Sequence, residues 1–532
     1  MDLKKRTIVS GDDLTIALKR GIDKLADTVK ITMGPKGKLV LIQRPNQHPT
    51  VTKDGVTVAN AINLEDEVEN LGAQIIKEAA ARTADEAGDG TTTATVLAQS
   101  IYSEGLKMIA AGFDRVGIKK GIEKALGVIV EAIDSAAKDI KGKEDLKKVA
   151  LISANGEEEI ATLIVNAINA AGVDGHVIVE EAKGFKSSLT VVDGYQIDRG
   201  FLSPYFVTDK NKMSCIFEKP YILMADRNFN SIHELMKPLE LALEESRPIL
   251  IVANDIDGDA LQGLVLNKVK GSLQICAIKS PGFGAARHDL LNDLESVVGG
   301  FVLTESHDMQ SFDHKSFGTC KKVIIRNGTA LFINEKSDSS NEDIEHRIRS
   351  IKEKLSDQTL SENEKELLNY RLQQLSGGIA ILRVGAATES ELIERYDRVD
   401  DALNATRAAI QEGILPGGGV ALVKVAETLN QLASKEGDQN VSAGIRVIAT
   451  ACLEPFKQIV KNSGKSPDLL LEKVKKSKSD TGYDSRHDRF DNMFSLGIVD
   501  PKKVVRCAIE NAASAASIIL SAGSSLIEVG KN

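Results

Sequence analysis

Two glycines, an aspartate and three threonines stand together at Gly88–Thr93 and have the residue types to bind phosphate. Glycines let the backbone turn tightly and approach a ligand closely. A helix that begins after them presents unpaired N–H groups and the positive end of its dipole, and the hydroxyls of Thr91, Thr92 and Thr93 lie at the same point. The stretch predicts a phosphate site, and a helix–helix turn capped by threonine is the alternative.

Asp89 stands inside this stretch, where its carboxylate would repel a phosphate unless a cation lay between them. Mg²⁺ is commonly held by one or two carboxylates together with phosphate oxygens, so it is the cation that the pattern favours. A second acidic turn follows Lys53 at Asp54-Gly55. From local sequence alone, an ordinary Asp-Gly turn is the simpler interpretation of that segment.

Helices are expected on both sides of the glycines. The apolar residues before them recur at helical spacing and are Val68, Leu71, Ile75 and Ala79. Those after them share one helical face and are Ala94, Leu97, Ala98 and Ile101. Further upstream, a helix is expected over 12–33, ending at Gly34-Pro35, and then a hairpin of 39–43 with 50–53.

The middle third of the chain predicts an α/β domain. Its strand-like runs are Val177–Glu180, Leu189–Val192, Tyr221–Ala225, Ile249–Val252, Leu273–Ala277, Val323–Ile325 and Ala330–Ile333. Helical patterns alternate with them at Ile232–Glu245 and Gly258–Val269. Residues 341–376 predict a helical hairpin with a Ser361–Glu364 capping box and solvated charged faces. Because both ends of the chain are helical and Ala-rich, the middle is expected to be inserted into a domain that the termini form.

Composition indicates a soluble globular protein with about two to four domains. Hydrophobic residues make up 42% and charged residues 27% of the 532 positions, and a net charge of −9 argues against broad nucleic-acid binding. No apolar run reaches the ~18 residues of a membrane span, and the N-terminus has no targeting pattern. The scattered cysteines indicate reduced structural thiols in a cytosolic protein; they are Cys215, Cys276, Cys320, Cys452 and Cys507.

Two other nucleotide-binding patterns fail on their spacing. Gly464-Lys465-Ser466 is like the end of a Walker A motif, but Ile459 stands where its first glycine is required. Gly282-Phe283-Gly284 is no dinucleotide fingerprint, because Arg287 takes the place of the third glycine.

A series of motifs, in order and spacing, resembles the group I chaperonins, the GroEL family, over nearly the whole chain. The motifs are Thr32–Gly37, Lys53–Val58, Gly88–Ala94, Arg199–Phe206, Lys279–Gly284, Val399–Arg407 and Pro416–Val420. The resemblance implies a multidomain fold of α+β and α/β parts. A mostly helical equatorial ATP-binding domain would comprise 1–135 and 412–532, a small intermediate hinge domain 136–192 and 380–411, and an inserted α/β apical domain 193–379.

The resemblance also implies the activity. The protein would be a cytoplasmic ATPase that folds proteins, classed with the isomerases, with ATP and Mg²⁺ as cofactors and K⁺ as a further candidate cation. Its partners would be further copies of itself in seven-membered rings, single or double, a cochaperonin lid and unfolded client proteins. Neither nucleic acid nor a membrane is expected as a partner.

Residue roles carry over by position. Asp89 would hold Mg²⁺, and Asp54 and Asp401 would orient or deprotonate the attacking water. The other implied nucleotide contacts are Thr32, Met33, Gly34, Pro35, Lys53, Gly90, Thr91, Thr92, Thr93, Gly418, Ile498 and Asp500.

The base end of the implied nucleotide site departs from the family. Asn-Ala-Ala is usual after the Gly-Tyr pair, whereas Asp484, Ser485 and Arg486 follow Tyr483 here. Asp484 and Ser485 take the base-contacting positions, and Arg486 is left to stack on the base, pair with Asp484 or point to solvent. The C-terminal segment Ser525–Asn532 also lacks the Gly-Gly-Met repeats common in the family.

Client and lid contacts are implied at apolar positions of the apical domain, where core packing is the alternative for residues at helical spacing. These positions are Phe201, Tyr205, Phe206, Met236, Leu239, Leu261, Val265 and Leu266. Arg199 and Glu389 match an inter-subunit ion pair, which as a surface pair contributes ~0–1 kcal/mol.

The leading function is therefore an ATP-dependent chaperonin that captures non-native proteins on apolar surfaces and folds them in an enclosed cavity. The alternative is a degenerate or moonlighting paralogue, a holding scaffold with weak or no ATPase, which the altered base end supports. A nucleotide-using metabolic enzyme has no constellation of substrate residues in its favour.

Overall fold

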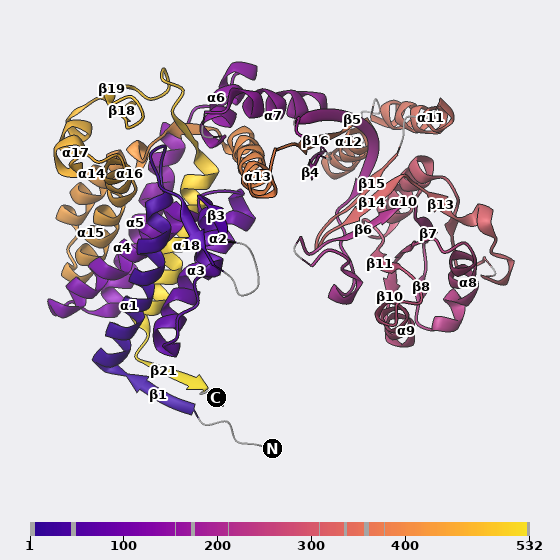
Figure 1. The fold of residues 1–532 in the computed structure, drawn as a ribbon, viewed down its shortest axis with the longest axis horizontal. Helices are drawn as coiled ribbons and strands as arrows, with labels where there is room; N and C mark the ends of the chain where they lie inside the picture. The colour runs from indigo at the N-terminus through magenta and orange to yellow at the C-terminus, as the bar shows by residue number, and fades with distance from the viewer. Residues whose placement is uncertain are drawn as a thin grey trace. The chain divides into compact units, whose positions relative to one another are not determined.

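The computed structural model describes residues 6–43, 49–154, 156–171, 176–182, 184–210, 212–307, 309–334, 338–355, 361–376 and 378–528. The chain forms two compact units (Figure 1). The first unit is Met1–Val165, Val179–Ser188 and Arg383–Asn532, and the second is Asn166–Ile178 and Leu189–Leu382. The second unit is thus inserted into the first, as the likeness between the two chain ends predicts.

The first unit is a helical bundle. Its helices are α1 (Gly11–Val29), α2 (Gly55–Ala61), α3 (Glu67–Ala87), α4 (Thr91–Ala110), α5 (Arg115–Ala136), α6 (Lys143–Ser153), α13 (Glu389–Glu412), α14 (Val420–Lys435), α15 (Gln439–Ala451), α16 (Glu454–Asn462), α17 (Pro467–Lys476) and α18 (Lys502–Ser521). Helix α7 (Glu158–Ala171) runs across the boundary between the units, and the 3₁₀ turn η1 (Lys30–Thr32) extends α1.

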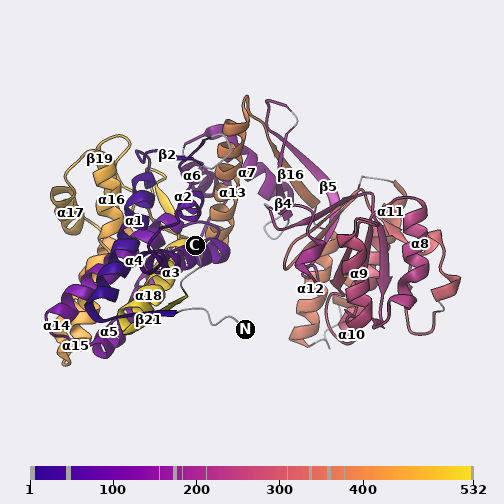
Figure 2. The same cartoon turned by 60° about the horizontal axis from the view of Figure 1, so that its bottom comes forward.

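Helix α18 is central to this bundle, packing on α3, α4 and α5 (Figures 1 and 2). In the part of the chain that the structure describes, it is the one helix long and apolar enough to cross a membrane, and most of it is buried. Its small residues Ala508, Ala512 and Ala516 are almost completely buried. Alanine lets helices approach closely and has the highest helix propensity, which accounts for the Ala-rich ends of the chain.

The buried face of α3 differs from the one predicted. Val68, Leu71 and Ile75 are only partly buried against the core, whereas Ala73 and Ile76 are fully buried. The helix is rotated because small residues let α1 come close: a Cβ on Gly72 would meet the Leu18 carbonyl oxygen at 2.6 Å. The prediction from the large apolar residues therefore placed the buried face of α3 wrongly, because the closest contact is made by glycine and alanine.

Short two-stranded sheets complete the first unit. They are β1 (Arg6–Ser10) with β21 (Ser524–Glu528), β2 (Val40–Ile42) with β3 (Thr50–Thr52), β17 (Ile414–Pro416) with β20 (Val499–Pro501), and β18 (Thr481–Asp484) with β19 (Arg489–Asn492), all antiparallel. The β1–β21 pair joins the two chain ends. The β2–β3 pair confirms the predicted hairpin, whose turn at 44–48 lies outside the described residues, as do Asn155, Gly377 and the last residues, 529–532.

The second unit contains two larger sheets. One has the order β11-β9-β7-β12 with β13 beside β7, and the other β4-β16-β5-β15-β14-β6. The strands are β4 (His176–Glu181), β5 (Ser188–Ile197), β6 (Cys215–Glu218), β7 (Tyr221–Ala225), β9 (Ile249–Ala253), β11 (Ile275–Lys279), β12 (Val302–Leu303), β13 (Gly318–Thr319), β14 (Lys322–Ile325), β15 (Ala330–Ile333) and β16 (Gly378–Val384). Strands β7 and β9 are buried along their whole length, which explains their unbroken apolar sequences.

The helices of this unit also follow the predicted pattern. They are α8 (Met236–Glu244), α9 (Gly258–Val269), α10 (Ala285–Val298), α11 (Asp338–Leu355) and α12 (Glu362–Ser376), and a minor pair of strands is β8 (Asn228–Phe229) with β10 (Asp255–Ile256). Helices α11 and α12 pack together as the predicted helical hairpin, and Ser361 and Glu364 bond reciprocally as a capping box.

The expectation that the charged faces of this hairpin lie in solvent is wrong for Arg371. This side chain is 1% exposed and donates from Nε to Asp293 at 2.6 Å and from Nη1 to Asp289 at 2.7 Å. Arg347 of α11 also donates to Asp293, at 2.7 Å. Asp293 of α10 is completely buried, and a buried carboxylate requires cationic partners, which the hairpin supplies.

Candidate functional site

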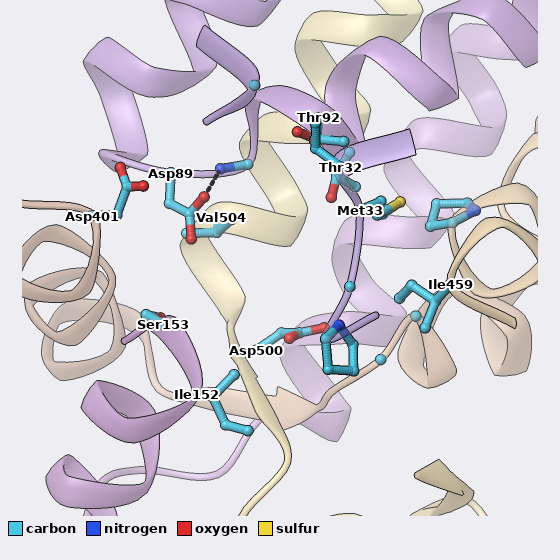
Figure 3. Close-up of a pocket in the computed structure, with 18 of the residues that line it drawn as sticks. Thr32, Met33, Asp89, Thr92, Ile152, Ser153, Asp401, Ile459, Asp500 and Val504 are labelled. Atoms are coloured by element: carbon cyan, nitrogen blue, oxygen red, sulfur yellow. Dashed lines mark hydrogen bonds between the residues drawn. The ribbon is translucent and has the colours of Figure 1, made fainter. Parts of the chain in front are cut away.

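A cavity of about 750 Å³ lies within the first unit and is lined by segments far apart in the sequence. Every residue predicted to bind nucleotide or to act in hydrolysis lines it. Figure 3 shows several of them around the cavity, among them Asp89, Asp401, Thr32 and Asp500. Thr32 and Asp89 lie where helices meet loops, whereas Asp401 lies inside α13 and Asp500 in β20.

The turn between α3 and α4 is built by its glycines. Gly88 ends α3 with φ 74° and Gly90 begins α4 with φ 95°, both in the left-handed region. Gly88 also lies against α13, since a Cβ there would meet the Asn404 Cβ at 2.2 Å. The N-cap of α4 is Gly90, with no side-chain cap, so the threonine-capped turn is not formed. The first N–H groups of α4 therefore have no capping side chain, as an anion site at a helix start requires.

Three carboxylates from separate segments meet at this turn: Asp54 before α2, Asp89 between α3 and α4, and Asp401 in α13. Burial and the Asp54 charge raise the pKa of Asp89. Burial, followed by the charges of Asp89 and Asp54, raises the pKa of Asp401 well above its ordinary value. The three negative groups repel one another, and a cation between them would relieve the repulsion.

Backbone hydrogen bonds fix two of these carboxylates. Asp54 accepts from the N–H of Val56 at 3.1 Å and of Thr57 at 2.7 Å, so it also caps α2, and Asp89 accepts from the N–H of Gly90 at 2.5 Å. Within the described ranges, no group of three or more His, Cys, Asp or Glu side chains forms a metal site by itself. Carboxylate oxygens are hard ligands, and a site with one or two of them suits Mg²⁺ that takes its remaining ligands from phosphate or water.

Cationic side chains also line the cavity. Lys53 donates to the Gly34 carbonyl oxygen at 3.0 Å, and burial, with the charges of Arg398 and Arg486, lowers its pKa. Arg398 of α13 pairs with Glu157 and Glu394. The cavity thus combines acidic side chains and free helix N–H groups with nearby cations, an arrangement that suits a polyanion bound together with a cation.

Gly418, Ile498 and Asp500 also line the cavity. The backbone N–H groups of Gly419 and Gly418 bond to Asp500, and burial together with the Asp89 charge raises the pKa of Asp500 to about 6. A Cβ on Gly417 would meet an Asp500 oxygen at 3.0 Å, so the glycines let this strand and loop lie close. A hydrogen-bonding carboxylate beside an apolar wall can hold a sugar and a base.

Asp484 lines the cavity, and its contact with a nucleotide stays a prediction; in the structure its carboxylate is bonded within its own turn. It is 3% exposed and accepts from the backbone N–H groups of Arg486 at 3.0 Å and His487 at 3.2 Å, and it bonds His487 Nδ1 at 2.7 Å. Burial works against its charge, yet the bonds from His487 and Arg486 lower the pKa of Asp484. The carboxylate therefore holds the turn between β18 and β19, and Ser485 beside it is also buried.

Several lining residues were not predicted, among them Ile152, Ser153, Asp397 and Ile459. Asp397 lies one helical turn before Asp401, and its i, i+4 spacing is a signal that could have revealed it. Ile152 and Ser153 end α6, and nothing in their local sequence indicates a site.

The rejected Walker-like segment is not a phosphate site. Gly464 lies between α16 and α17, but Ile459, where the first glycine is required, is inside α16 and not in a loop. Lys465 is paired with Asp488 at 2.6 Å.

The predicted client-binding residues of the second unit fall into two groups. Tyr205, Met236 and Leu266 are 69%, 43% and 53% exposed, and Phe201, Leu261 and Val265 are partly buried. Phe206 and Leu239 lie in the core at 0% and 9% exposure, so here the core alternative holds and neither presents a surface. Helical spacing missed two exposed neighbours, Leu243 and Val269.

The remaining predicted residues concern contacts between subunits and the cysteines. Arg199 donates to the Ser280 carbonyl oxygen at 3.4 Å and lies over the Phe283 ring at 4.9 Å. Glu389 is exposed at the start of α13, and its pairing with Arg199 of another subunit stays a prediction. All cysteines are buried and free, as expected.

Comparison with known proteins agrees with this fold. The model of the TCP-1/cpn60 chaperonin family matches residues 25–524. Among solved structures, the chain is similar to two crystal forms of the chaperonin gp146 from the bacteriophage EL 2 (Pseudomonas aeruginosa), both in the presence of ATP-BeFx. Each shares 23% identity and covers 99% of both chains, with TM-scores of 0.72 and 0.64, which shows a common fold. Because the family match spans nearly the whole chain, the protein belongs to the TCP-1/cpn60 chaperonin family and is a divergent member of it.

Proposed function

We propose that this chaperonin binds Mg²⁺ and ATP in the cavity of the first unit and uses hydrolysis to drive the folding of captured proteins. The observation that carries the proposal is the meeting of Asp54, Asp89 and Asp401 at the uncapped start of α4. These residues come from three separate segments, and no single one of them would suggest phosphoryl transfer. The ATP-BeFx in the gp146 crystals supports the choice of nucleotide.

The phosphates would lie at Gly90–Thr93, where backbone N–H groups and hydroxyls are available, and Asp89 would hold Mg²⁺ against them. Bound Mg²⁺ supplies charge neutralisation and fixes the phosphate oxygens. The residues fit it, because the raised pKa values of Asp89 and Asp401 reflect an excess of negative charge at this point.

Asp54 and Asp401 would receive hydrogen bonds from the attacking water and orient it in line with the terminal phosphate. Phosphoryl transfer depends on such positioning more than on a strong base. Asp54 is held rigidly by two backbone N–H groups, whereas Asp401 is carried on α13. Movement of α13 would therefore set the rate of hydrolysis and couple it to the shape of the subunit.

We further propose the three-domain division, with an equatorial domain of 1–135 and 412–532, a hinge of 136–192 and 380–411, and an apical domain of 193–379. Clients and a cochaperonin would bind the exposed residues of α8 and α9 together with Tyr205. Seven-membered rings, in the cytoplasm, would present several such surfaces at once, so that individually weak contacts give strong capture.

The decisive experiment measures ATP turnover, recovery of a denatured client with and without a cochaperonin, and particle mass on one preparation. Turnover, client recovery and a ring mass are expected together. Client holding without turnover would contradict the proposal and favour the second candidate, a scaffold with weak or no ATPase. The changed turn after Tyr483 is the observation that keeps this candidate in view.

A further inference from the structure

Arg486 stands at the tip of the β18–β19 hairpin, and this hairpin forms a wall of the nucleotide cavity. Hydrogen bonds within the hairpin hold this tip in place. Asp484 accepts the backbone N–H of Arg486, and Tyr483 Oη donates to Asp488 at 2.7 Å. The position from which the Arg486 side chain starts is therefore held by two partly buried hydrogen bonds.

The guanidinium of Arg486 lies against the turn between α6 and α7. A Cβ built on Gly156 would meet Nη1 of Arg486 at 2.3 Å, Cζ at 3.3 Å and Nη2 at 3.4 Å. All three atoms are close, so the guanidinium is seated on the glycine backbone, where a side chain would displace it. The Arg486 charge also contributes to the lowered pKa of Lys53. The side chain thus extends from the hairpin to the α6–α7 turn.

The surroundings of this side chain match a base more closely than a phosphate. Ile152, Leu496 and Ile498 line the same cavity as Arg486 and supply apolar surface on which a base can pack. A guanidinium is planar and stacks on aromatic faces. Arg486 is exposed as well as lining the cavity.

We propose that Arg486 is a specificity-determining residue of this site: its guanidinium covers the base of a bound purine nucleotide and joins the β18–β19 hairpin to the α6–α7 turn. The proposal rests on nucleotide binding as argued above and extends it to the choice of base. Glu157, in the same turn, pairs with Arg398 of α13. A base held under Arg486 therefore also stabilises the turn that is tied to the helix carrying Asp401.

The test measures dissociation constants of ATP, GTP, CTP and tripolyphosphate for the full chain and for Arg486→Ala and Arg486→Lys. Arg446→Ala is the matched control, because Arg446 is an exposed arginine of α15 outside the cavity. Arg486→Ala should weaken ATP and GTP roughly 3- to 30-fold, the range of a cation–π contact, with a smaller loss for CTP and none for tripolyphosphate. Arg486→Lys should lose nearly as much ATP and GTP affinity as Arg486→Ala, because lysine restores the positive charge but not the planar guanidinium.

Hydrogen exchange provides a second measurement, which a change in charge alone would not affect. Nucleotide should protect residues 151–157 in the parent and fail to do so in Arg486→Ala. Unchanged ATP affinity in Arg486→Ala, an equal loss for tripolyphosphate, or full rescue by lysine would overturn the proposal while nucleotide binding stands. A parent that binds no nucleotide would overturn both proposals together.

Discussion

Single residues at this site are arranged at a cost in stability. Asp89, Asp401 and Asp500 all have raised pKa values, because burial and one another's charge disfavour their ionised forms. Such unfavourable arrangements concentrate at functional sites, where a ligand later compensates them. Each of these carboxylates therefore carries an unfavourable electrostatic energy, which makes the roles of individual residues measurable.

Asp401→Ala should separate hydrolysis from binding. The substitution removes a water-positioning carboxylate and leaves the start of α4 intact, so kcat for ATP should fall by about 100-fold or more while the dissociation constant of Mg-ATP changes little. Steady-state turnover and equilibrium dialysis measure the two quantities. Asp468→Ala, outside the cavity, is the control. Turnover at the parent rate would remove Asp401 from the mechanism.

Asp500→Asn should change how stability depends on pH. The folded protein holds a proton on Asp500 up to about pH 6, whereas the unfolded chain loses it near 3.8. Ionisation in the folded state therefore costs stability, and this cost grows from about pH 4 to pH 6 and is complete above it. The variant should be about 1–2 kcal/mol more stable than the parent at pH 7.5, with the difference shrinking toward pH 4.5.

Urea unfolding of the nucleotide-free protein at both pH values measures this difference. A stability gain of the same size at pH 4.5 and 7.5 would show that the Asp500 charge is not its cause.

At the scale of elements, α8 and α9 each expose apolar residues that a folded core would bury. Met236 and Leu243 on α8 and Leu266 and Val269 on α9 are between 43% and 64% exposed. The same helices bury Leu239 and Leu264 beneath, so each helix has a core face and an exposed apolar face. An exposed apolar surface of this kind marks a binding surface.

Tyr205→Glu should weaken capture of a denatured client about tenfold or more, because a charge replaces a large contact side chain. ATP turnover should be unchanged, since the cavity lies in the other unit. Sedimentation with a labelled unfolded client measures capture. Leu469→Glu, which places the same charge on an exposed apolar site of α17, is the control. Equal capture by parent and Tyr205→Glu would exclude this surface.

The α11–α12 hairpin is fastened to α10 by a buried ion pair. Arg371→Met leaves Asp293 buried and short of a partner, and should destabilise the second unit by about 3–5 kcal/mol. Replacing both residues, as in Arg371→Met with Asp293→Leu, should recover most of that loss. Arg349→Met on the exposed side of α11 should have little effect. Similar losses for the single and double variants would show that volume, not charge, is the cause.

At the scale of the whole molecule, two units are joined by chain segments that cross between them at four places. The residues that line the cavity all belong to the first unit, and the helices α8 and α9 with their exposed apolar residues belong to the second. In the proposed function, nucleotide binding in the first unit would affect the apolar surface of the second. Helix α13 carries Asp401 and begins a few residues after the chain crosses between the units at Leu382–Arg383, so we propose that it takes part in this coupling.

Mg-ATP should therefore stabilise one unit selectively. At a hundredfold excess over its dissociation constant, a ligand adds about 2.7 kcal/mol to the state that binds it. In calorimetry of a hydrolysis-deficient variant, only the transition of the first unit should move upward, and EDTA should reverse most of the shift. Equal movement of all transitions, or none with nucleotide present, would contradict a Mg-dependent site confined to this unit.

Local sequence determined much of this molecule. The turn at Gly88–Gly90, the strands of the second unit and the Ser361 capping box follow from residues within a few positions of one another, where glycine conformations, apolar runs and capping hydrogen bonds act. The order of the motifs identified the family, and with it the predicted nucleotide-binding residues, because each of those motifs is a short local pattern.

Only the tertiary structure decided the rest. The rotation of α3, the burial of Phe206 and Arg371, and the use of Asp484 as a structural acceptor depend on neighbours tens to hundreds of residues away. The spacing of apolar residues indicates which of them share a face of a helix, but it does not indicate which part of the protein packs against that face. The meeting of Asp54, Asp89 and Asp401 is likewise a product of packing, because the three residues lie far apart in the sequence and no local pattern brings them together.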